Sequence, residues 1–282
     1  MKAFSIFAVI IAASMTFSAC GKTNEIAVIT REDGSGTRST FTEMFEITVK
    51  GDDGTVTDNT TLEATVANQT EVVITNVSGN KNAIGYISLG SLNDTVKAVS
   101  IDGVSAETKN VKSGEYKAAR EFFIATPKAS ASPAAEDFIS FILSAEGQAV
   151  VGKSYIAVND TAPSYVGNGA AGKITVAGSS SVNPVMEKLK EAYLAVNPNA
   201  EIEIQMSDSS SGLSNAAEGL CDIAMSSRKL KEAELETLMP TTIAIDAIVV
   251  IVNKENAISN LTSDEINDIF TGKITDWSGI SK

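Results

Sequence analysis

The sequence predicts an α/β fold divided into two lobes. Strand-like apolar runs alternate with helix-like segments along most of the chain, which is typical of lobes built on largely parallel sheets. The length of 282 residues suits one large domain or two lobes, with enough core to fold unaided. The segment Asn159–Gly172 is rich in turn residues and poor in large apolar ones, so we expect a linker there.

The strands are predicted from two kinds of apolar pattern. Apolar and polar residues alternate in Glu25–Thr30, Lys173–Ala177 and Glu201–Met206, as they do in half-buried strands. Short continuous apolar runs, typical of buried strands, occur at Asp222–Met225 and Ile243–Val252.

The helices are predicted from apolar periodicity and from capping residues. In Val185–Val196 the apolar residues fall on one stripe of a helix. A serine and a proline, suited to the N-cap and the first helical position, precede Ala134–Leu143. A Thr-Ser-Asp-Glu capping box precedes Ile266–Phe270. Gly51–Thr61, by contrast, is expected to be a surface loop.

The charge and residue types of the chain exclude several classes of function. The chain has 22 Lys and Arg residues against 35 Asp and Glu residues, a formal net charge of −13, and no histidine. It therefore lacks the commonest general base and metal ligand, and Cys20 and Cys221 are too few for a zinc cluster or a disulfide scaffold. Such acidity also argues against nucleic-acid binding. We expect no metal and no cofactor, and we expect Cys221 to be a small buried apolar residue.

Residues 1–19 have the features of a lipoprotein signal peptide. Lys2 is followed by an uncharged apolar run, Phe4–Phe17, which is shorter than the ~20 residues that a helix needs to span a bilayer. Small residues then precede Cys20, as in a bacterial lipobox. The pattern predicts an extracytoplasmic protein, anchored by lipid on Cys20 to the outer face of the cytoplasmic membrane. An ordinary signal peptide with a cysteine nearby is the alternative.

Four serine-rich turns are candidate binding elements. Each follows a strand-like run, and the first three also precede a helix-like one: Arg31–Thr37, Ala177–Ser181, Ser207–Gly212 and Ser226–Arg228. The first turn of a helix has unpaired N–H groups and a partial positive charge, which attract anions. Glycine lets a ligand approach the backbone, and hydroxyls add donors. Together the turns predict a shared anion site, although each one alone could simply cap its helix.

Arg31 supplies the positive charge that such a site needs. Its guanidinium offers a planar pair of donors that matches a tetrahedral oxyanion. Asp33 follows closely enough in the sequence to be expected to hold this guanidinium in place.

Motifs in both halves of the chain resemble those of one known family. From Ile174 to Lys282 the motifs are ITVAGSSSVNP, IQMSDSSSGLS, DIAMSSRKL and IFTGKITDWS. They resemble the N-terminal half of the phosphate-binding proteins that serve bacterial ABC phosphate importers. From Glu25 to Val158 the motifs REDGSGTR, NAIGYISLG, VKSGEY and FILSAEGQAVV resemble the C-terminal half of the same family.

The resemblance implies a two-lobed periplasmic-binding-protein fold of the type II-like form, with a hinge and an inter-lobe cleft, in circularly permuted order. The family's second half comes first here, and residues 159–172 join the usual C-terminus to the usual N-terminus. Lobe A is then residues 123–252, and lobe B is assembled from residues 22–122 and 253–282. Termini that lie close together on the surface make such a permutation physically reasonable. A wrongly joined reading frame is the alternative.

The resemblance also implies the function. A monomer would capture inorganic phosphate and deliver it to the membrane subunits of an ABC importer. Strands that cross between the lobes near Phe123–Ala125 and Ile248–Val252 would let the lobes close around one dehydrated anion. Many convergent donors are needed, because each must offset lost hydration. No bond is broken, so we expect no enzymatic activity.

Carried over position by position, the family's anion contacts fall on Arg31, Ser35, Gly36, Thr37, Ser180, Ser181, Ser209, Ser210 and Ser227. The register between Ser209 and Ser210 is open by one residue. Ser227 departs from the family, since some members have an aspartate there that accepts the proton of monohydrogen phosphate. Asp33 or Asp208 is a candidate acceptor in its place. The departure leaves two alternatives open, namely another oxyanion such as sulfate or molybdate, and a ligand-sensing role.

Two further patterns suggest other chemistry. Ser226–Lys229 fits the S-x-x-K pattern of serine-lysine acyl hydrolases, but the sequence lacks the S-D-N and K-T-G partner motifs. A helix expected over Ser227–Leu238 explains the lysine as a solvated residue. Residues 167–173 nearly form a nucleotide phosphate loop, but Ile174 stands where Ser or Thr should bind magnesium, and a strand-like run follows. The hydrolase remains as a remote alternative.

Overall fold

The structure is a computed structural model that describes residues 24–129 and 132–280. The predicted signal peptide and the predicted lipidation site, Cys20, lie outside these residues. Within the described ranges, no helix is long and apolar enough to cross a membrane.

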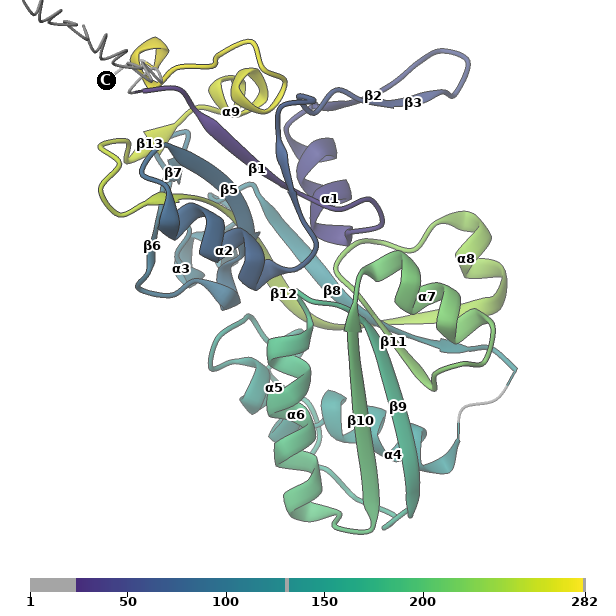
Figure 1. The fold of residues 1–282 in the computed structure, drawn as a ribbon. Coiled ribbons are helices and arrows are strands. Elements are labelled where there is room, and N and C mark those ends of the chain that lie inside the picture. The colour runs from purple at the N-terminus through teal and green to yellow at the C-terminus, as the bar shows by residue number, and fades with distance from the viewer. Residues whose placement is uncertain (1–23, 130–131, 281–282) are drawn as a thin grey trace, which may run out of the picture.

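One mixed sheet runs through the whole molecule (Figure 1). Its strand order is β10 (Ala200–Ser207), β9 (Gly172–Ser179), β11 (Ile223–Ser226), β8 (Ala119–Pro127), β12 (Leu238–Asn253), β5 (Ala83–Ser88), β1 (Ala27–Arg31) and β4 (Thr65–Ala67), with β6 (Val96–Ala98) also paired to β12. β9 is parallel to β10 and β11, and β1 is parallel to β4 and β5. Every pair that involves β8 or β12 is antiparallel. The expectation of largely parallel sheets is therefore wrong at the centre, because β8 and β12 run between the two halves in opposite directions.

The helices begin where the sequence offers capping residues. They are α1 (Gly36–Met44), α2 (Thr70–Gly79), α3 (Thr108–Ser113), α4 (Pro133–Leu143), α5 (Ala145–Val151), α6 (Asn183–Val196), α7 (Ser209–Ala217), α8 (Glu232–Thr237) and α9 (Ser263–Phe270). Ser132 accepts the N–H of Ala135, and Thr262 accepts the N–H of Glu265, as N-cap side chains do. The predicted helices are confirmed as α4, α6 and α9, whereas the helix expected from Ser227 begins only at α8.

The predicted strands are confirmed as β1, β9, β10, β11 and β12, with shifts at their ends. The predicted loop Gly51–Thr61 is wrong in part, because it contains β3 (Val56–Asp58), which pairs with β2 (Thr48–Lys50) in a hairpin. β7 (Ser100–Ile101) pairs with β13 (Asn260–Leu261). The linker expected at residues 159–172 has no helix or strand until β9 begins at Gly172.

Buried apolar side chains form a separate core around each half of the sheet. Core A surrounds β9 and β11 and includes Phe122 of β8 and Ala244 of β12. Core B surrounds β1 and β5 and includes Ala118, just before β8, and Ala247 of β12. Each of the two crossing strands therefore passes from one core to the other within a few residues.

β8 and β12 form a two-stranded ribbon between the cores, which we call the β8–β12 ribbon (Figure 1). Their pairing extends from Leu238 opposite Pro127 to Ala247 opposite Ala119, with one register shift. The crossing segments predicted at 123–125 and 248–252 lie on these strands, a few residues after the change of core. This ribbon fixes where elements of the two cores face each other.

Cys221 is buried in a small apolar cluster with Ala177, Leu213 and Ala224. Burial raises the pKa of its thiol to about 11. The prediction of a small buried apolar residue at this position is confirmed.

Candidate anion-binding site

The predicted turns connect strands to helices at the place where the two cores meet (Figure 1). Arg31 ends β1, and Ser35 then caps α1. Ser179 ends β9 shortly before α6 begins. Ser207 ends β10, and Asp208 caps α7. Unpaired N–H groups of several helices are thereby brought towards the same region.

Hydrogen bonds link these turns across the two cores. Arg31 Nη2 donates to Ser180 Oγ at 3.0 Å. Thr37 Oγ1 lies 2.8 Å from Ser181 Oγ and 3.4 Å from Ser227 Oγ. The turn after β1 is thus in direct contact with the turns after β9 and β11.

The turn after β10 joins the same group through Ser209. The backbone N–H of Ser227 donates to Ser209 Oγ at 3.1 Å. Gly36 lies against both serines, since a Cβ at this position would be 2.5 Å from Ser209 Oγ and 2.7 Å from Ser227 Oγ. A glycine is therefore what lets the start of α1 approach core A so closely.

The predicted contacts in these turns are almost completely buried. We call them the site cluster, and its members are Arg31, Ser35, Thr37, Ser180, Ser181, Ser209 and Ser227. Ser35 belongs to it by position, since its Oγ accepts the backbone N–H of Arg38 at the start of α1. None is more than 2% exposed. Buried polar groups need partners, and here the partners come from two separate cores.

Ser210 does not belong to the site cluster. Its Oγ donates to the carbonyl oxygen of Gly34 at 3.2 Å and accepts from Arg228 Nη2 at 3.0 Å. It is half-buried at the edge of the cluster, whereas Ser209 lies inside it. Of the two registers considered, the geometry favours Ser209.

The expectation that Asp33 holds Arg31 is wrong. The Asp33 side chain is 97% exposed, and its Oδ1 lies 2.8 Å from Nη1 of Arg38. Glu32 holds Arg31 instead. Arg31 Nε donates to Glu32 Oε2 and Arg31 Nη2 donates to Glu32 Oε1, each at 2.7 Å. Asp33 occupies the turn that leads to Gly34, whose positive φ of 89° directs the chain into α1 and places Asp33 beside Arg38.

Asp208, the other candidate acceptor, is occupied as a helix cap. Its Oδ1 accepts from the backbone N–H of Ser211 at 2.9 Å, and its Oδ2 accepts from Ser211 Oγ at 2.6 Å. It lies at the edge of the site cluster, close to Gly34.

Three residues of this region were not predicted from the sequence. Thr70, the first residue of α2, accepts from Arg31 Nη1 at 3.4 Å and lies 3.3 Å from both Ser180 Oγ and Ser181 Oγ. Ser179 Oγ donates to Ser227 Oγ at 3.0 Å. Arg120 of β8 donates through Nη1 to Thr37 Oγ1 at 2.8 Å. Ser179 belongs to the predicted serine-rich turn Ala177–Ser181 without being among its predicted contacts, whereas Thr70 and Arg120 carried no signal in the sequence.

Each guanidinium of the region has one carboxylate partner. Arg31 pairs with Glu32, which is half-buried, and Arg120 pairs with Asp246 at 3.0 Å in a fully buried ion pair. Burial raises the pKa of Asp246 and lowers the pKa of Arg120, although their mutual attraction opposes both shifts. Both carboxylates are engaged by guanidiniums. The groups that meet in the site cluster are therefore guanidinium N–H groups and hydroxyls, all of which can donate hydrogen bonds.

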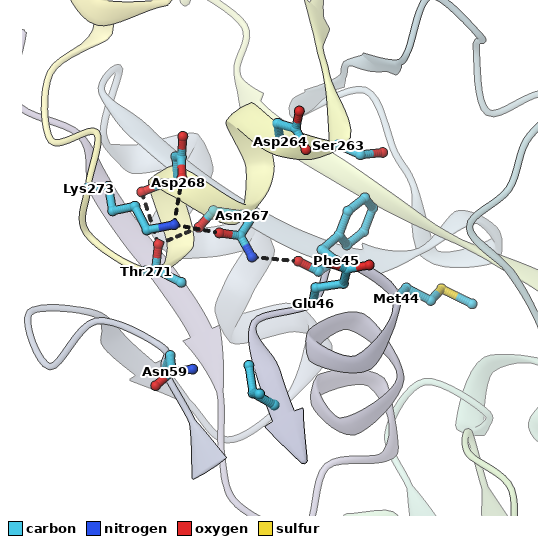
Figure 2. A pocket seen from close by; sticks show the side chains of 11 residues that line it. Met44, Phe45, Glu46, Asn59, Ser263, Asp264, Asn267, Asp268, Thr271 and Lys273 are labelled. Carbon is cyan, nitrogen blue, oxygen red and sulfur yellow. Dashed lines mark hydrogen bonds and ion pairs between the residues drawn. The ribbon is translucent and has the colours of Figure 1, made fainter. Parts of the chain in front are cut away.

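A large surface cavity lies elsewhere, beside the end of α1 and α9 (Figure 2). It has about 830 Å³ and is lined by none of the predicted anion contacts. Its polar groups bond to each other, since Lys273 Nζ lies 2.9 Å from Asp268 Oδ1 and Asn267 Nδ2 donates to the Phe45 carbonyl oxygen at 2.8 Å. This cavity therefore gives no sign of a charged ligand.

The two patterns that suggested other chemistry have ordinary structural settings. Ser226 Oγ donates to the Arg228 carbonyl oxygen at 2.8 Å, and Lys229 is exposed. Residues 167–173 lead into β9 rather than into a helix. Neither arrangement resembles a nucleophile with its base, or a nucleotide phosphate loop.

Two cores joined by a ribbon, with buried donors gathered between them, define a two-lobed ligand-binding protein. Consistent with this, the PBP superfamily domain model matches residues 14–146 and 163–279. "Phosphate-binding protein PstS 2" of Streptococcus agalactiae serotype V is 47% identical over 274 residues, which is 97% of this chain and 94% of that protein. The protein of the same name from Streptococcus pneumoniae serotype 4 is 44% identical over 256 residues, 90% of this chain and 87% of that one.

A solved structure is similar over nearly the same extent. It is the crystal structure of a phosphate ABC transporter phosphate-binding protein from Streptococcus pneumoniae TIGR4, with a TM-score of 0.72 and 44% identity. The similarity covers 91% of this chain and all of the other. The chain therefore belongs to the PBP superfamily and, within it, to the family of the PstS relatives. The two-lobed fold predicted from the sequence is confirmed.

Proposed function

We propose that this protein captures inorganic phosphate outside the cytoplasm and delivers it to an ABC importer. The observation that carries the proposal is the site cluster, where buried hydroxyls and a guanidinium from both cores converge. α1, α2 and α7 begin at Gly36, Thr70 and Ser209, beside this cluster, and their N-terminal N–H groups add to its donors. The names of the relatives support phosphate as the anion.

In this proposal lobes A and B, divided as above, close around one anion. The contacts are Arg31, Ser35, Gly36, Thr37, Ser180, Ser181, Ser209 and Ser227, with Ser210 at the edge. The neutral hydroxyl contacts between the cores are then exchanged for charge-assisted bonds to the anion, each of ~1.5–3 kcal/mol. Because binding and release make and break no covalent bond, the proposal assigns no catalytic residue.

A second candidate function is the binding of sulfate or molybdate. It is favoured by Ser227, a hydroxyl where an acceptor for a phosphate proton is expected. The carboxylates that might replace that acceptor are engaged, Asp33 with Arg38 and Asp208 with Ser211.

Calorimetric titration with phosphate, sulfate and molybdate at two pH values tests both candidates. The protein used is the chain without residues 1–19. We expect one tight site for phosphate and much weaker binding of the other anions. Sulfate binding as tight as that of phosphate would transfer the assignment to the second candidate, and absence of heat with every anion would refute both.

The proposed cellular setting follows from the N-terminal pattern and the relatives. A lipid on Cys20 would anchor a monomer to the outer face of the membrane, beside the importer's membrane subunits. Replacement of the cysteine, Cys20→Ser, should release the protein from the membrane fraction. Continued attachment of this variant would contradict the anchor and leave phosphate binding untouched.

The circularly permuted order relative to the wider family is also part of the proposal. The alignment with the Streptococcus agalactiae relative extends over 97% of this chain and 94% of that protein, so the two share one order of segments. A shared order supports a natural gene over a wrongly joined reading frame.

A further inference from the structure

Arg120 lies where β8 passes from core B to core A. It is directly opposite Asp246 in the β8–β12 ribbon and is 6% exposed. Its Nε and Nη2 donate to Asp246 Oδ2 at 3.1 and 3.0 Å. Ser88 Oγ donates to the other oxygen of Asp246 at 2.8 Å, and the ring of Phe122 lies 4.9 Å from the Arg120 guanidinium carbon. The guanidinium is therefore held in one orientation, with Nη1 directed away from Asp246.

The remaining nitrogen, Nη1, reaches groups that belong to both cores. It donates to Thr37 Oγ1 at 2.8 Å and to the Ser227 carbonyl oxygen at 3.4 Å. A hydroxyl that accepts a hydrogen bond from a guanidinium turns its own proton towards another acceptor. The proton of Thr37 Oγ1 is then available for donation to another group in the site cluster, where Ser181 Oγ and Ser227 Oγ are its neighbours.

Arg31 likewise donates hydrogen bonds to hydroxyls, on the other side of the site cluster. Its Nη2 donates to Ser180 Oγ and its Nη1 donates to Thr70 Oγ1. Two guanidiniums thus fix hydroxyls as donors from opposite sides. A surplus of oriented donors suits an anion, whose oxygens only accept.

Arg120 is also reachable from outside the cluster. It lines a cavity of about 550 Å³, together with Thr40 of α1 and with Leu230, which packs against the small apolar cluster around Cys221. The Arg120 guanidinium therefore lies beside a space that is bordered by residues from both halves of the sheet.

We propose that Arg120 is a positioning residue of the anion site, which holds Thr37 as a hydrogen-bond donor to the anion. The inference rests on the proposed function. It adds a residue that contacts Thr37, one of the proposed anion contacts, and does not contact the anion itself. A purely structural role, as half of a buried ion pair between two strands, is the competing explanation.

The test measures coupling between Arg120 and Thr37 in phosphate affinity. Removal of Arg120 alone would leave Asp246 buried without its partner, which is strongly destabilising. The variant is therefore the neutral pair Arg120→Gln with Asp246→Asn, which removes both charges together; Asn keeps the size of Asp, whereas Gln is shorter than Arg. Phosphate dissociation constants are measured by calorimetry for the wild type, the neutral pair, Thr37→Val, and the combination of all three substitutions.

We expect the neutral pair and Thr37→Val each to weaken phosphate binding about tenfold or more. Their combination should weaken it by much less than the product of the two effects, because both remove the same oriented donor. Thr70→Val is the matched control, since Arg31 holds its hydroxyl, and its effect should multiply with that of the neutral pair. Thr37→Ser, which keeps the hydroxyl, should bind nearly as the wild type does.

A neutral pair that melts at a lower temperature but binds phosphate as the wild type does would overturn the inference. Effects of the neutral pair and Thr37→Val that simply multiply would also overturn it. Neither result affects the proposed function, which instead fails if the wild type itself does not bind phosphate.

Discussion

Two of the buried polar clusters among the described residues differ in where their hydrogen-bond partners come from. In the first, the site cluster, Arg31 and Thr37 of core B bond to Ser180 and Ser181 of core A. In the second, which we call the linker cluster, Asp137 of α4 accepts from Tyr165 Oη at 2.7 Å and Tyr193 Oη at 2.9 Å. The linker cluster lies entirely within core A, and the site cluster lies between two cores.

The difference separates a structural cluster from a binding one. Asp137 Oδ1 also accepts the backbone N–H of Asn168, so its carboxylate fastens the segment between α5 and β9 to core A. The Asp137 carboxylate accepts hydrogen bonds from several donors there, so these donors are already used and are not available to a ligand. In the site cluster the contacts are mainly between hydroxyls of 2.8 to 3.4 Å, and an anion can replace them with stronger bonds.

The largest loss of phosphate affinity is expected from Arg31→Ala, in the site cluster. It should weaken phosphate binding by about 100-fold or more, because it removes a charge-assisted contact and releases Ser180 and Thr70. Calorimetry measures the affinity, and thermal denaturation checks the fold. Arg38→Ala is the matched control, since Arg38 pairs with Asp33 and Asp58 and contacts Arg31 only through its backbone carbonyl oxygen. Equal effects of the two substitutions would contradict the assigned site.

Gly36→Ala should come next. The added Cβ would lie 2.5 Å from Ser209 Oγ, so α1 must move away from core A and the donors no longer converge. We expect phosphate affinity to fall by about 30-fold or more, measured in the same titration. Gly79→Ala, at the end of α2 with nothing within 4 Å of the added atom, should bind as the wild type does.

Asp137→Asn should affect stability alone. The substitution turns an acceptor of the linker cluster into a donor that faces two tyrosine hydroxyls, at a cost of about 1–3 kcal/mol in the free energy of unfolding. Chemical denaturation measures this change. The dissociation constant for phosphate should stay within twofold of the wild type, and a large loss of affinity would show that the two clusters are not independent.

The smallest expected change in phosphate affinity distinguishes Glu32 from Asp33, the two carboxylates that follow Arg31 in the sequence. Glu32→Gln should weaken phosphate binding several-fold, because Glu32 orients the guanidinium through two short bonds. Asp33→Asn should leave the affinity unchanged, since Asp33 is exposed and bonded to Arg38. The reverse order of effects in calorimetry would restore the role first assigned to Asp33.

The sequence predicts the parts of the site that local patterns describe. Serine-rich turns between strands and helices identify Ser180, Ser209 and Thr37 as neighbours, since each local sequence specifies a strand end and a helix start. Thr70 and Arg120 were missed because each is a single residue without a motif, brought to the site by sheet pairing distant in sequence. Spacing alone also could not tell Glu32 from Asp33, because the choice depends on where Arg38 lies.

The same limit applies to the fold. Periodicity and capping residues predict β1, β9, β10, β11, β12, α4, α6 and α9. They do not predict the antiparallel centre of the sheet, because it follows from how β8 and β12 connect the cores. The hairpin of β2 and β3 lies where the sequence predicts a loop, because Gly51 and its acidic neighbours are typical of turns.

The β8–β12 ribbon has a mechanical consequence. Backbone hydrogen bonds between Leu238 and Ala247 of one strand and their partners in the other prevent sliding, while a two-stranded ribbon twists readily. We therefore expect displacement of one core against the other to be chiefly a rotation about the ribbon. One distance, measured between a fluorophore on each core, would then follow this movement, and the pair would serve as an optical gauge of free ligand concentration.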